Sequence, residues 1–234
     1  LYGKQNSSVR YRLGELLAKA APPPPNDSDL ETVVIGVTDS GLPAAEGYAA
    51  ASGIRLTQGL VKNRYIGRTF ISPNQSDRER AVLRKFSPLS ENIKGKRLIV
   101  VDYTIVRCTT PRAVVKMLRE EGAHEIHLRI SAPPYKWPCF YGIDVGSQSE
   151  LLAANLDLEE MRAFLGVDSL AYLSIENVKL AIDAPGDGLC DACVTGNYSV
   201  EVPLTTDKYA LETQHLSNQS MLHVRKMCNL LSGI

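Results

Sequence analysis

The sequence has no apolar run that approaches the roughly 18 residues of a membrane-spanning helix. It also has no excess of charge, because 26 Lys and Arg residues balance 26 Asp and Glu residues. A dedicated nucleic-acid-binding protein usually carries a basic excess, although a neutral chain can still hold one local basic cleft for a phosphorylated ligand. We therefore expect neither a membrane nor a nucleic acid as a partner, and a phosphorylated small molecule is not excluded.

Cysteine is scarce and odd in number, with five residues at positions 108, 139, 190, 193 and 228. A small secreted domain held by disulfides has a denser and usually even set, so this usage favours an intracellular protein. We expect a cytoplasmic location, with an organelle as the open alternative. A metal or a cluster suits these thiols better than a disulfide framework does.

The remaining composition is that of an ordinary folded protein. Hydrophobic residues make up 44% of the 234 residues and charged residues 22%, so a sizeable core can form and disorder is not expected. This length suits one large domain or two small ones. The chain starts at Leu1 without a secretory signal, and we expect this end to be the cut edge of a fragment or a processed product.

Hydrophobic patterns in the first half of the chain predict a parallel sheet. Residues 33–37 and 97–101 are near-continuous apolar runs, which suit strands covered on both faces. After the second run we expect a helix with Thr110 as N-cap and Gly122 at its stop, and then a third strand over 125–130. Strand, helix and strand of these lengths form a βαβ unit. The expected fold class is α/β, an open and mainly parallel sheet with flanking helices.

Three parts are expected along the chain. Residues 1–31 hold a leading helix, with apolar residues at helical spacing over 7–20, and a proline run that we interpret as a stiff surface connector. Residues 32–202 form the α/β domain. Residues 203–234 form a C-terminal tail, in which residues 221–231 show a short apolar helical pattern.

A polar segment over residues 59–92 separates the first two strands. Its basic residues and the flexible Gly59 and Gly67 suit a mobile lid over an anionic ligand, while a solvated surface loop and helix is the open alternative. The basic residues are Lys62, Arg64, Arg68, Arg78, Arg80, Arg84 and Lys85.

Two polar loops follow the first two strands, at the edge of a parallel sheet where ligands bind. The first is D-S-G at 39–41, and the second runs from Asp102 to Thr110 with hydroxyl groups at 104, 109 and 110. Hydroxyls, backbone N–H groups and a helix N-terminus bind phosphate well, and an Asp at a strand tip can accept from sugar hydroxyls or hold Mg²⁺. A simple capped helix would explain Thr110 but not the other residues.

The segment at 98–110, LIVVDYTIVRCTT, resembles the phosphoribosyl pyrophosphate (PRPP) motif of type I phosphoribosyltransferases, which is a strand, two acidic residues and S-I-V-R-G-T-T. Five further blocks resemble successive blocks of the amidophosphoribosyltransferase family, in that family's order and spacing. They are VVIGVTDSGLPAA (33–45), GLVKNRYIGRTFISPNQ (59–75), ISAPPYKWPCFYGID (130–144), GVDSLAYLS (166–174) and CDACVTGNY (190–198). The resemblance covers roughly residues 7–202.

This resemblance implies a type I phosphoribosyltransferase-like fold and a glycosyltransferase activity, the first committed step of de novo purine synthesis. Ammonia released from glutamine would displace pyrophosphate at C1 of PRPP and give 5-phosphoribosylamine. The implied partners are PRPP, ammonia or glutamine, inhibitory purine nucleotides, a glutaminase domain upstream or as a separate piece, and further copies of the chain in a homo-oligomer. Without the glutaminase half, which would precede residue 1, the chain would use free ammonia. Mg²⁺ is the implied cofactor.

The resemblance also implies a role for each matching residue. Asp102 would accept hydrogen bonds from the ribose hydroxyls and, with Ser40 and Tyr103, form the Mg²⁺ site. The implied catalytic residues are Asp102, Tyr65 and Arg68, and the last two would lie on the lid. The implied PRPP-binding set is Lys62, Asp102, Tyr103, Thr104, Arg107, Cys108, Thr109 and Thr110.

Two positions depart from the family motif. Tyr103 stands where a second acidic residue is usual, and a phenol carries no charge at neutral pH, so one metal or ribose ligand is lost. Cys108 stands where glycine is usual, and its Cβ would hinder a positive φ or a close phosphate contact. The alternative function is therefore a catalytically impaired relative that binds PRPP or a nucleotide. A variant enzyme for another sugar pyrophosphate is a third hypothesis.

Three cysteines suggest a second cofactor. Cys139, Cys190 and Cys193 match three of the four cysteines that ligate a [4Fe–4S] cluster in some family members, and the fourth would precede Leu1. The C-x-x-C spacing is weak by itself, and the match of Cys139 strengthens it. Thiols without a metal, or zinc in a partial site, are the alternatives.

Overall fold

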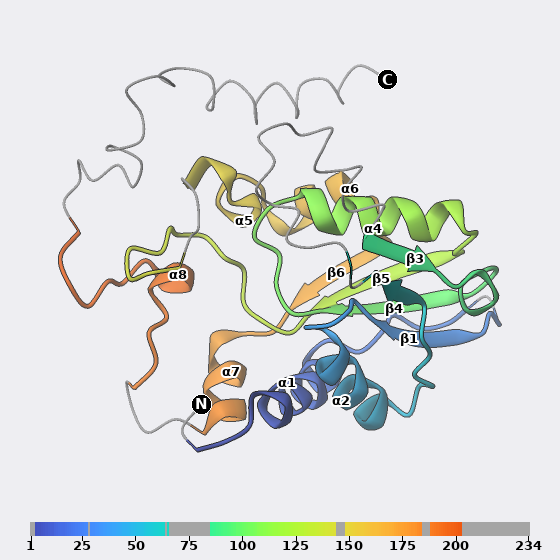
Figure 1. Ribbon diagram of the computed structural model, residues 1–234, viewed down its shortest axis with the longest axis horizontal. Coiled ribbons are helices and arrows are strands. Elements are labelled where there is room, and N and C mark those ends of the chain that lie inside the picture. The colour runs from blue at the N-terminus through green and yellow to red at the C-terminus, as the bar shows by residue number, and fades with distance from the viewer. Residues whose placement is uncertain are drawn as a thin grey trace.

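The computed structural model shows an α/β fold built on a four-stranded sheet (Figure 1). The strands are β1 (Thr32–Gly36), β4 (Arg97–Asp102), β5 (Glu125–Ile130) and β6 (Ser169–Tyr172), in the order β1-β4-β5-β6. Every neighbouring pair is parallel, which confirms the predicted open, mainly parallel sheet. The described residues are 3–27, 29–63, 65, 85–143, 148–183 and 188–202.

The apolar runs of the sequence form the first three strands of this sheet. In β4, Leu98, Ile99, Val100 and Val101 are all fully buried. Their side chains alternate between two hydrophobic clusters, because successive residues of a strand face opposite sides of the sheet. Both faces are therefore covered, as near-continuous apolar strands require.

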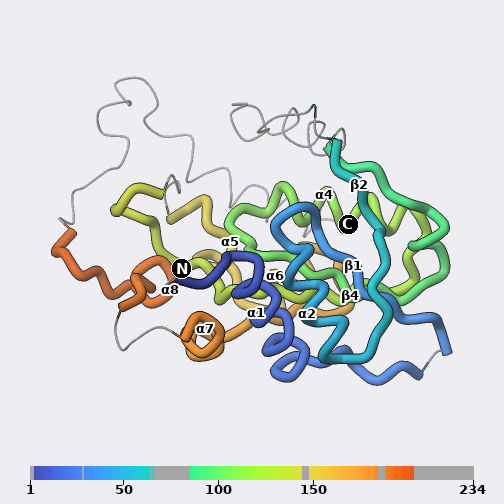
Figure 2. The backbone as a smooth tube through the Cα atoms, turned by 60° about the horizontal axis from the view of Figure 1, so that its bottom comes forward, coloured from blue at the N-terminus to red at the C-terminus, as the bar shows by residue number. Residues whose placement is uncertain are grey.

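Helices cover the two faces in separate groups (Figures 1 and 2). One face carries α1 (Asn6–Ala20), α2 (Leu42–Ser52) and α7 (Ile175–Ile182). The opposite face carries α4 (Thr109–Glu120) and α6 (Leu158–Leu165). No helix in the described ranges has both the length and the apolar character needed to cross a bilayer.

Shorter elements connect this framework. They are the antiparallel pair β2 (Leu60–Lys62) and β3 (Phe86–Pro88), the 3-10 turns η2 (Ser90–Asn92) and η3 (Gln148–Glu150), and the single-turn helices α5 (Leu152–Asn155) and α8 (Ala192–Thr195). The pair β2 and β3 lies within the segment 59–92 that we interpreted as a lid. Residues 64 and 66–84 of that segment, and the tail 203–234 with its helical pattern, lie outside the described residues.

Helices α1 and α2 approach each other closely because glycine occupies the contact. A Cβ built on Gly14 would lie 1.9 Å from the Ala44 carbonyl oxygen, and one built on Gly47 would lie 1.9 Å from the Tyr11 carbonyl oxygen. Backbone carbonyls thus occupy the space that any side chain would need. This contact holds α1 against the sheet and brings its first turns to the carboxyl edge (Figure 1).

The start of α4 differs from the prediction. The helix begins at Thr109, and Cys108 is the N-cap residue, with φ −74° and ψ −20° and no side-chain cap bond. Thr110 is therefore inside the helix and is not the N-cap. Its Oγ1 is buried with no hydrogen-bond partner among the described residues. The predicted stop holds, since α4 ends at Glu120 and Gly122 follows with φ 84°.

The proline connector lies on the surface, and two buried arginines of the sheet donate hydrogen bonds to its carbonyl oxygens. Arg97 donates to the Pro24 carbonyl at 2.6 Å and the Pro25 carbonyl at 3.2 Å. Arg129 donates to the Pro22 carbonyl at 3.1 Å and the Ala21 carbonyl at 3.0 Å. The connector lies outside helix and sheet, so its carbonyl oxygens have no partner from regular secondary structure, and the arginines satisfy them and fix the connector.

Candidate functional site

The two polar loops of the sequence meet at the carboxyl edge of the sheet. A Cβ built on Gly41 would lie 2.7 Å from the Val101 carbonyl oxygen and 3.2 Å from the Cα of Asp102. The Gly41 N–H also donates to the Val37 carbonyl at 2.9 Å. The loop with Asp39 and the half-buried Ser40 thus packs directly against the tip of β4. Only glycine at position 41 allows this approach.

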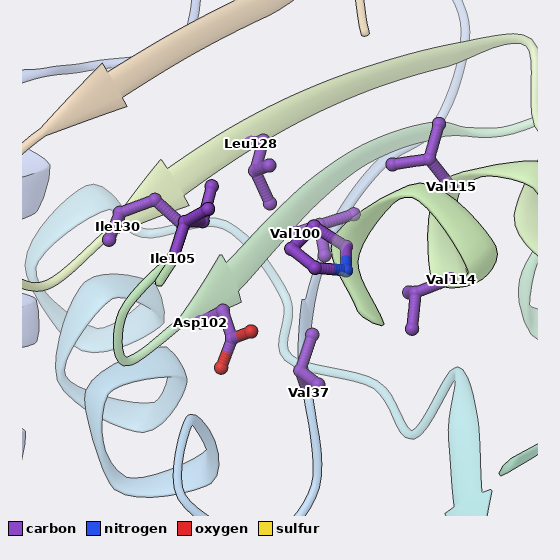
Figure 3. A pocket seen from close by; sticks show the side chains of 9 residues that line it. Val37, Val100, Asp102, Ile105, Val114, Val115, Leu128 and Ile130 are labelled. Atoms are coloured by element: carbon purple, nitrogen blue, oxygen red, sulfur yellow. The ribbon is translucent and has the colours of Figure 1, made fainter. Parts of the chain in front are cut away.

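Asp102 is half-buried, and the other side chains that line the cavity beside it are aliphatic or proline (Figure 3). The Tyr103 backbone N–H donates to its Oδ1 at 2.7 Å. Burial raises the pKa of Asp102 to about 7, and the bond from Tyr103 opposes that rise only in part. Near neutral pH this carboxyl is poised between two states: protonated it donates a hydrogen bond, and ionised it accepts.

A small cavity lies between the strand tips and α4 (Figure 3). Its volume is about 10 Å³, which is room for about one water molecule. Its lining is Val37, Val100, Asp102, Ile105, Pro111, Val114, Val115, Leu128 and Ile130. A sugar phosphate cannot enter this space.

Tyr103 contacts an arginine that the sequence analysis did not identify. The guanidinium of Arg10, from α1, lies over the Tyr103 ring at 4.9 Å from its centroid. Cations stack favourably on aromatic faces, so Arg10 is held beside the strand tip. Nothing in the local sequence signals this contact, because it depends on how α1 packs against the sheet.

Of the residues that the sequence analysis assigned to the lid, two lysines lie near the D-S-G loop. Lys62, at the end of β2, forms an ion pair with Asp39 of the D-S-G loop. Lys85 lies nearby, and burial together with the charge of Lys62 lowers the pKa of Lys85. Tyr65 is fully exposed and is not brought to the site, and Arg68 lies outside the described residues.

The turn between β4 and α4 holds the predicted phosphate-binding residues. Thr109 is buried, Thr104 and Cys108 are half-buried, and the N-terminus of α4 follows directly. Orphan N–H groups at a helix N-terminus and a partial positive charge favour an anion at this position. The Thr110 Oγ1, which has no hydrogen-bond partner in the described part of the chain, lies in the first turn of α4. The arrangement suits a phosphate group.

Arg107 is bound to a residue from a distant segment. Its Nη2 donates to Glu150 Oε2 at 2.8 Å. The neighbouring Val106 carbonyl accepts from the Leu152 N–H at 3.1 Å. Glu150 is a second residue that the sequence analysis missed, because its sequence neighbourhood carries no ligand-binding pattern.

The three predicted cluster cysteines share one region of the molecule. Cys139 and Cys193 are half-buried and Cys190 is exposed. Burial raises the pKa of Cys193, and the two other thiols lie near enough to contribute to the rise. Within the described ranges, however, no three His, Cys, Asp or Glu side chains are arranged to hold a metal ion. The thiols gather there without forming a ligand set.

Comparison with known proteins relates this arrangement to one family. The phosphoribosyl transferase domain family matches residues 25–134. Amidophosphoribosyltransferase of Mycobacterium tuberculosis strain H37Rv is 48% identical over 209 residues, which is 87% of this chain and 38% of that protein. Amidophosphoribosyltransferase of Synechocystis is 50% identical over 196 residues, which is 84% of this chain and 38% of that protein.

Solved structures agree with the sequence comparisons. The structure of glutamine PRPP amidotransferase from B. subtilis, complexed with ADP and GMP, has a TM-score of 0.74 and 45% identity, and covers 86% of this chain and 44% of that one. The chain belongs to the amidophosphoribosyltransferase family. It spans 38% of the length of the two relatives above and contains the family's phosphoribosyltransferase domain.

Within this family, the structure changes the interpretation of Cys108. We expected a Cβ at this position to hinder a positive φ, but Cys108 has φ −74°, which any residue adopts. Its side chain packs against the core cluster beneath α4. Cysteine therefore fits the amidophosphoribosyltransferase turn without backbone strain. Tyr103 remains the larger departure, because it replaces a charge and takes Arg10 as its neighbour.

Proposed function

We propose that the chain is the phosphoribosyltransferase portion of an amidophosphoribosyltransferase, and that it converts PRPP and ammonia to 5-phosphoribosylamine and pyrophosphate. In this reaction a C–N bond forms at C1 of the ribose, the bond from C1 to the pyrophosphate oxygen breaks, and ammonia loses a proton to solvent. The observation that carries the proposal is the meeting of the D-S-G loop with the tip of β4 beside the N-terminus of α4.

Different groups of the site would bind the phosphate, the ribose and the pyrophosphate of PRPP. The turn of residues 103–108 and the N-terminus of α4 would bind the 5′-phosphate through backbone N–H groups, together with the hydroxyls of Thr109 and Thr110. Asp102 would accept hydrogen bonds from the ribose hydroxyls, which favours its ionised form and lowers its pKa on binding. The cation of Lys62 would neutralise charge on the leaving pyrophosphate.

Mg²⁺ is the proposed cofactor, and the donor set accommodates it with few protein ligands. Mg²⁺ commonly keeps several waters and binds one or two carboxylates together with phosphate oxygens of the substrate. This chain offers the carboxyl of Asp102, with the hydroxyls of Ser40 and Tyr103 as neutral neighbours. When bound, the ion would neutralise the pyrophosphate. The weak protein contribution implies that Mg²⁺ arrives mainly with the substrate.

The thiols lead to a separate proposal for the intact protein. Cys139, Cys190 and Cys193 would supply three of the four ligands of a [4Fe–4S] cluster, so a fourth donor is needed. In the described residues the three are not arranged to hold a metal, so cluster binding would also require them to move together. We derive no step of the reaction through a cluster. Iron and sulfide analysis of the longer protein tests the proposal, and the absence of both would contradict it.

The remaining proposed partners concern regulation and assembly. We propose glutamine as the ammonia source through a glutaminase domain, purine nucleotides as inhibitors, and a homo-oligomer. The B. subtilis relative was solved with ADP and GMP, which supports the nucleotide proposal. Calorimetric titration with GMP and ADP, and light scattering for the oligomer, are the corresponding measurements.

A second candidate is a catalytically impaired relative that binds PRPP without turnover. Tyr103 favours it, because the site presents a phenol under Arg10 where the family motif has a carboxylate. The decisive measurement is pyrophosphate release from PRPP with ammonium and Mg²⁺, alongside calorimetric binding of PRPP. Release supports the enzyme, and binding without release supports the second candidate. If PRPP neither binds nor reacts, both are wrong for this chain.

The variant Tyr103→Asp, alone and with Cys108→Gly, links the two candidates. It restores a second carboxylate, so we expect pyrophosphate release to rise if residue 103 limits the rate. Unchanged release in a variant that still binds PRPP would show that these positions do not set the activity.

A further inference from the structure

The turn that would bind the 5′-phosphate is held in place by a segment far along the chain. Glu150 of η3 pairs with Arg107 at 2.8 Å, although 43 positions separate the two residues. One position before Arg107 and two positions after Glu150, the Leu152 N–H donates to the Val106 carbonyl at 3.1 Å. One ion pair and one backbone hydrogen bond thus connect two adjacent points of the turn to the same support.

The supporting segment is itself well fixed. The Asn155 side-chain amide donates to the Gln148 carbonyl at 3.2 Å, the Ser149 carbonyl at 3.2 Å and the Leu151 carbonyl at 2.7 Å. Leu151 is fully buried, and α5 begins directly after it. Glu150 therefore belongs to a turn whose backbone carbonyls are bonded by Asn155 and which is anchored in the core by Leu151.

The guanidinium of Arg107 forms its ion pair with Glu150 of this segment. Its side chain is 29% exposed and that of Glu150 is 38% exposed, so the pair lies at the surface of the site rather than in the interior. A phosphate seated on backbone N–H groups of the turn needs those groups to be correctly oriented, and it does not need the arginine side chain.

We propose that Glu150 is a positioning residue, and that its pair with Arg107 is a strut that fixes the 103–108 turn for the 5′-phosphate. The Arg107 side chain then shapes the turn and does not contact the phosphate. This inference rests on the proposed function for the identity of the ligand, whereas the strut itself is a property of the free protein.

A double-mutant cycle tests the strut. The probe is ribose 5-phosphate, which carries the 5′-phosphate without the pyrophosphate, and binding is measured by calorimetry. We expect Arg107→Gln, Glu150→Gln and the double variant to weaken binding by the same factor, about 2- to 5-fold, because partly exposed ion pairs are worth little. Glu150→Asp should recover part of the loss, since it keeps the charge.

One outcome of the same cycle would contradict the strut. If Arg107 contacts the phosphate, Arg107→Gln weakens binding far more than Glu150→Gln does, and the strut is wrong. The matched control is Glu159→Gln on α6, which removes an ion pair to Arg162 with an N–O distance of 2.7 Å. This control should leave binding unchanged.

A second readout does not depend on any ligand. Amide hydrogen exchange of residues 104–108 should accelerate to the same extent in Glu150→Gln, Arg107→Gln and the double variant, while exchange in β4 and the unfolding temperature change little. Unchanged exchange in the turn would overturn the strut. If the wild-type chain does not bind ribose 5-phosphate, the exchange data alone decide on the strut, and binding and turnover of PRPP decide on the proposed function.

Discussion

Asp102 shows how a single residue can be recognised in the sequence while its chemical state is not. Its place after an apolar run predicts a strand tip, and it does end β4. Its pKa, however, depends on burial among groups from separate segments, such as Val37 after β1, Val114 of α4 and Ile105 of the turn between β4 and α4. A half-buried carboxyl that gives up part of its hydration shifts toward its protonated form.

A pH-dependent stability follows from this burial. The folded pKa of about 7 exceeds the ordinary value of 3.8, so the folded chain binds the proton more tightly and loses stability as the pH rises from about 4 to 7. Asp102→Asn removes this loss. We expect the variant to exceed the wild type in unfolding free energy by ~2–4 kcal/mol at pH 8, at about 1.4 kcal/mol per pH unit, and by much less at pH 4.5. Urea unfolding at both pH values checks this, and a difference independent of pH would contradict it.

The structure predicts that Cys108→Gly lowers stability, whereas the glycine of the family motif alone would suggest that it raises stability. Because φ is −74°, glycine has no strain to relieve at this position. Cys108→Gly adds backbone freedom to the unfolded chain and removes packing beneath α4, so we expect stability to fall by about 0.5–1 kcal/mol or more. Thermal unfolding is the measurement. A stabilised variant would mean that the turn prefers a conformation that cysteine resists.

At the scale of elements, the contact between α1 and α2 decides where Arg10 lies. The helical pattern of α1 was visible in the sequence and is confirmed over Asn6–Ala20. A helical stretch after the first strand was also expected and is α2, but its small residues give no marked apolar face that would indicate α1 as its neighbour. The contact depends on Gly14 and Gly47, which let the backbones approach. This geometry brings Arg10 to Tyr103.

Substitution of either glycine should disrupt this contact. The added methyl group of Gly14→Ala or Gly47→Ala would lie 1.9 Å from a backbone oxygen, so the helices must separate. We expect a loss of about 1–3 kcal/mol or more, as in other overpacked sites, measured by urea unfolding. Gly53→Ala is the control, because φ there is 71° but the surrounding space is open, and it should cost about 1 kcal/mol. Equal effects at the three sites would refute close packing as the cause.

At the scale of the whole molecule, the parallel sheet places the site. Because β1 and β4 run in the same direction in register, the loops that follow them open on one edge and touch. The parallel direction of the strands was predicted from the apolar runs, whereas the neighbouring positions of β1 and β4 were decided by the tertiary structure. The support from Glu150 is different, since it requires the chain to return to the turn after β5.

Ligand binding should therefore stabilise the molecule as a unit. PRPP at about 100 times its dissociation constant should add about 2.7 kcal/mol to the unfolding free energy and raise the unfolding temperature. If Mg²⁺ arrives with the substrate, chelation with EDTA should reduce this shift, while Mg²⁺ alone should shift the unfolding temperature little. A strong effect of Mg²⁺ without PRPP would contradict the limited donor set.

The sequence by itself determined the strands, the main helices, the strand-tip loops and the family motif, because these depend on local apolar periodicity and on residues adjacent in the chain. Only the tertiary structure decided the state of Asp102, the stacking of Arg10 on Tyr103, the start of α4 at Thr109 and the pair of Arg107 with Glu150. The start of α4 depends on the local backbone conformation at Cys108, and the other three depend on the distance and surroundings between groups from separate segments, about which residue spacing along the chain carries no information.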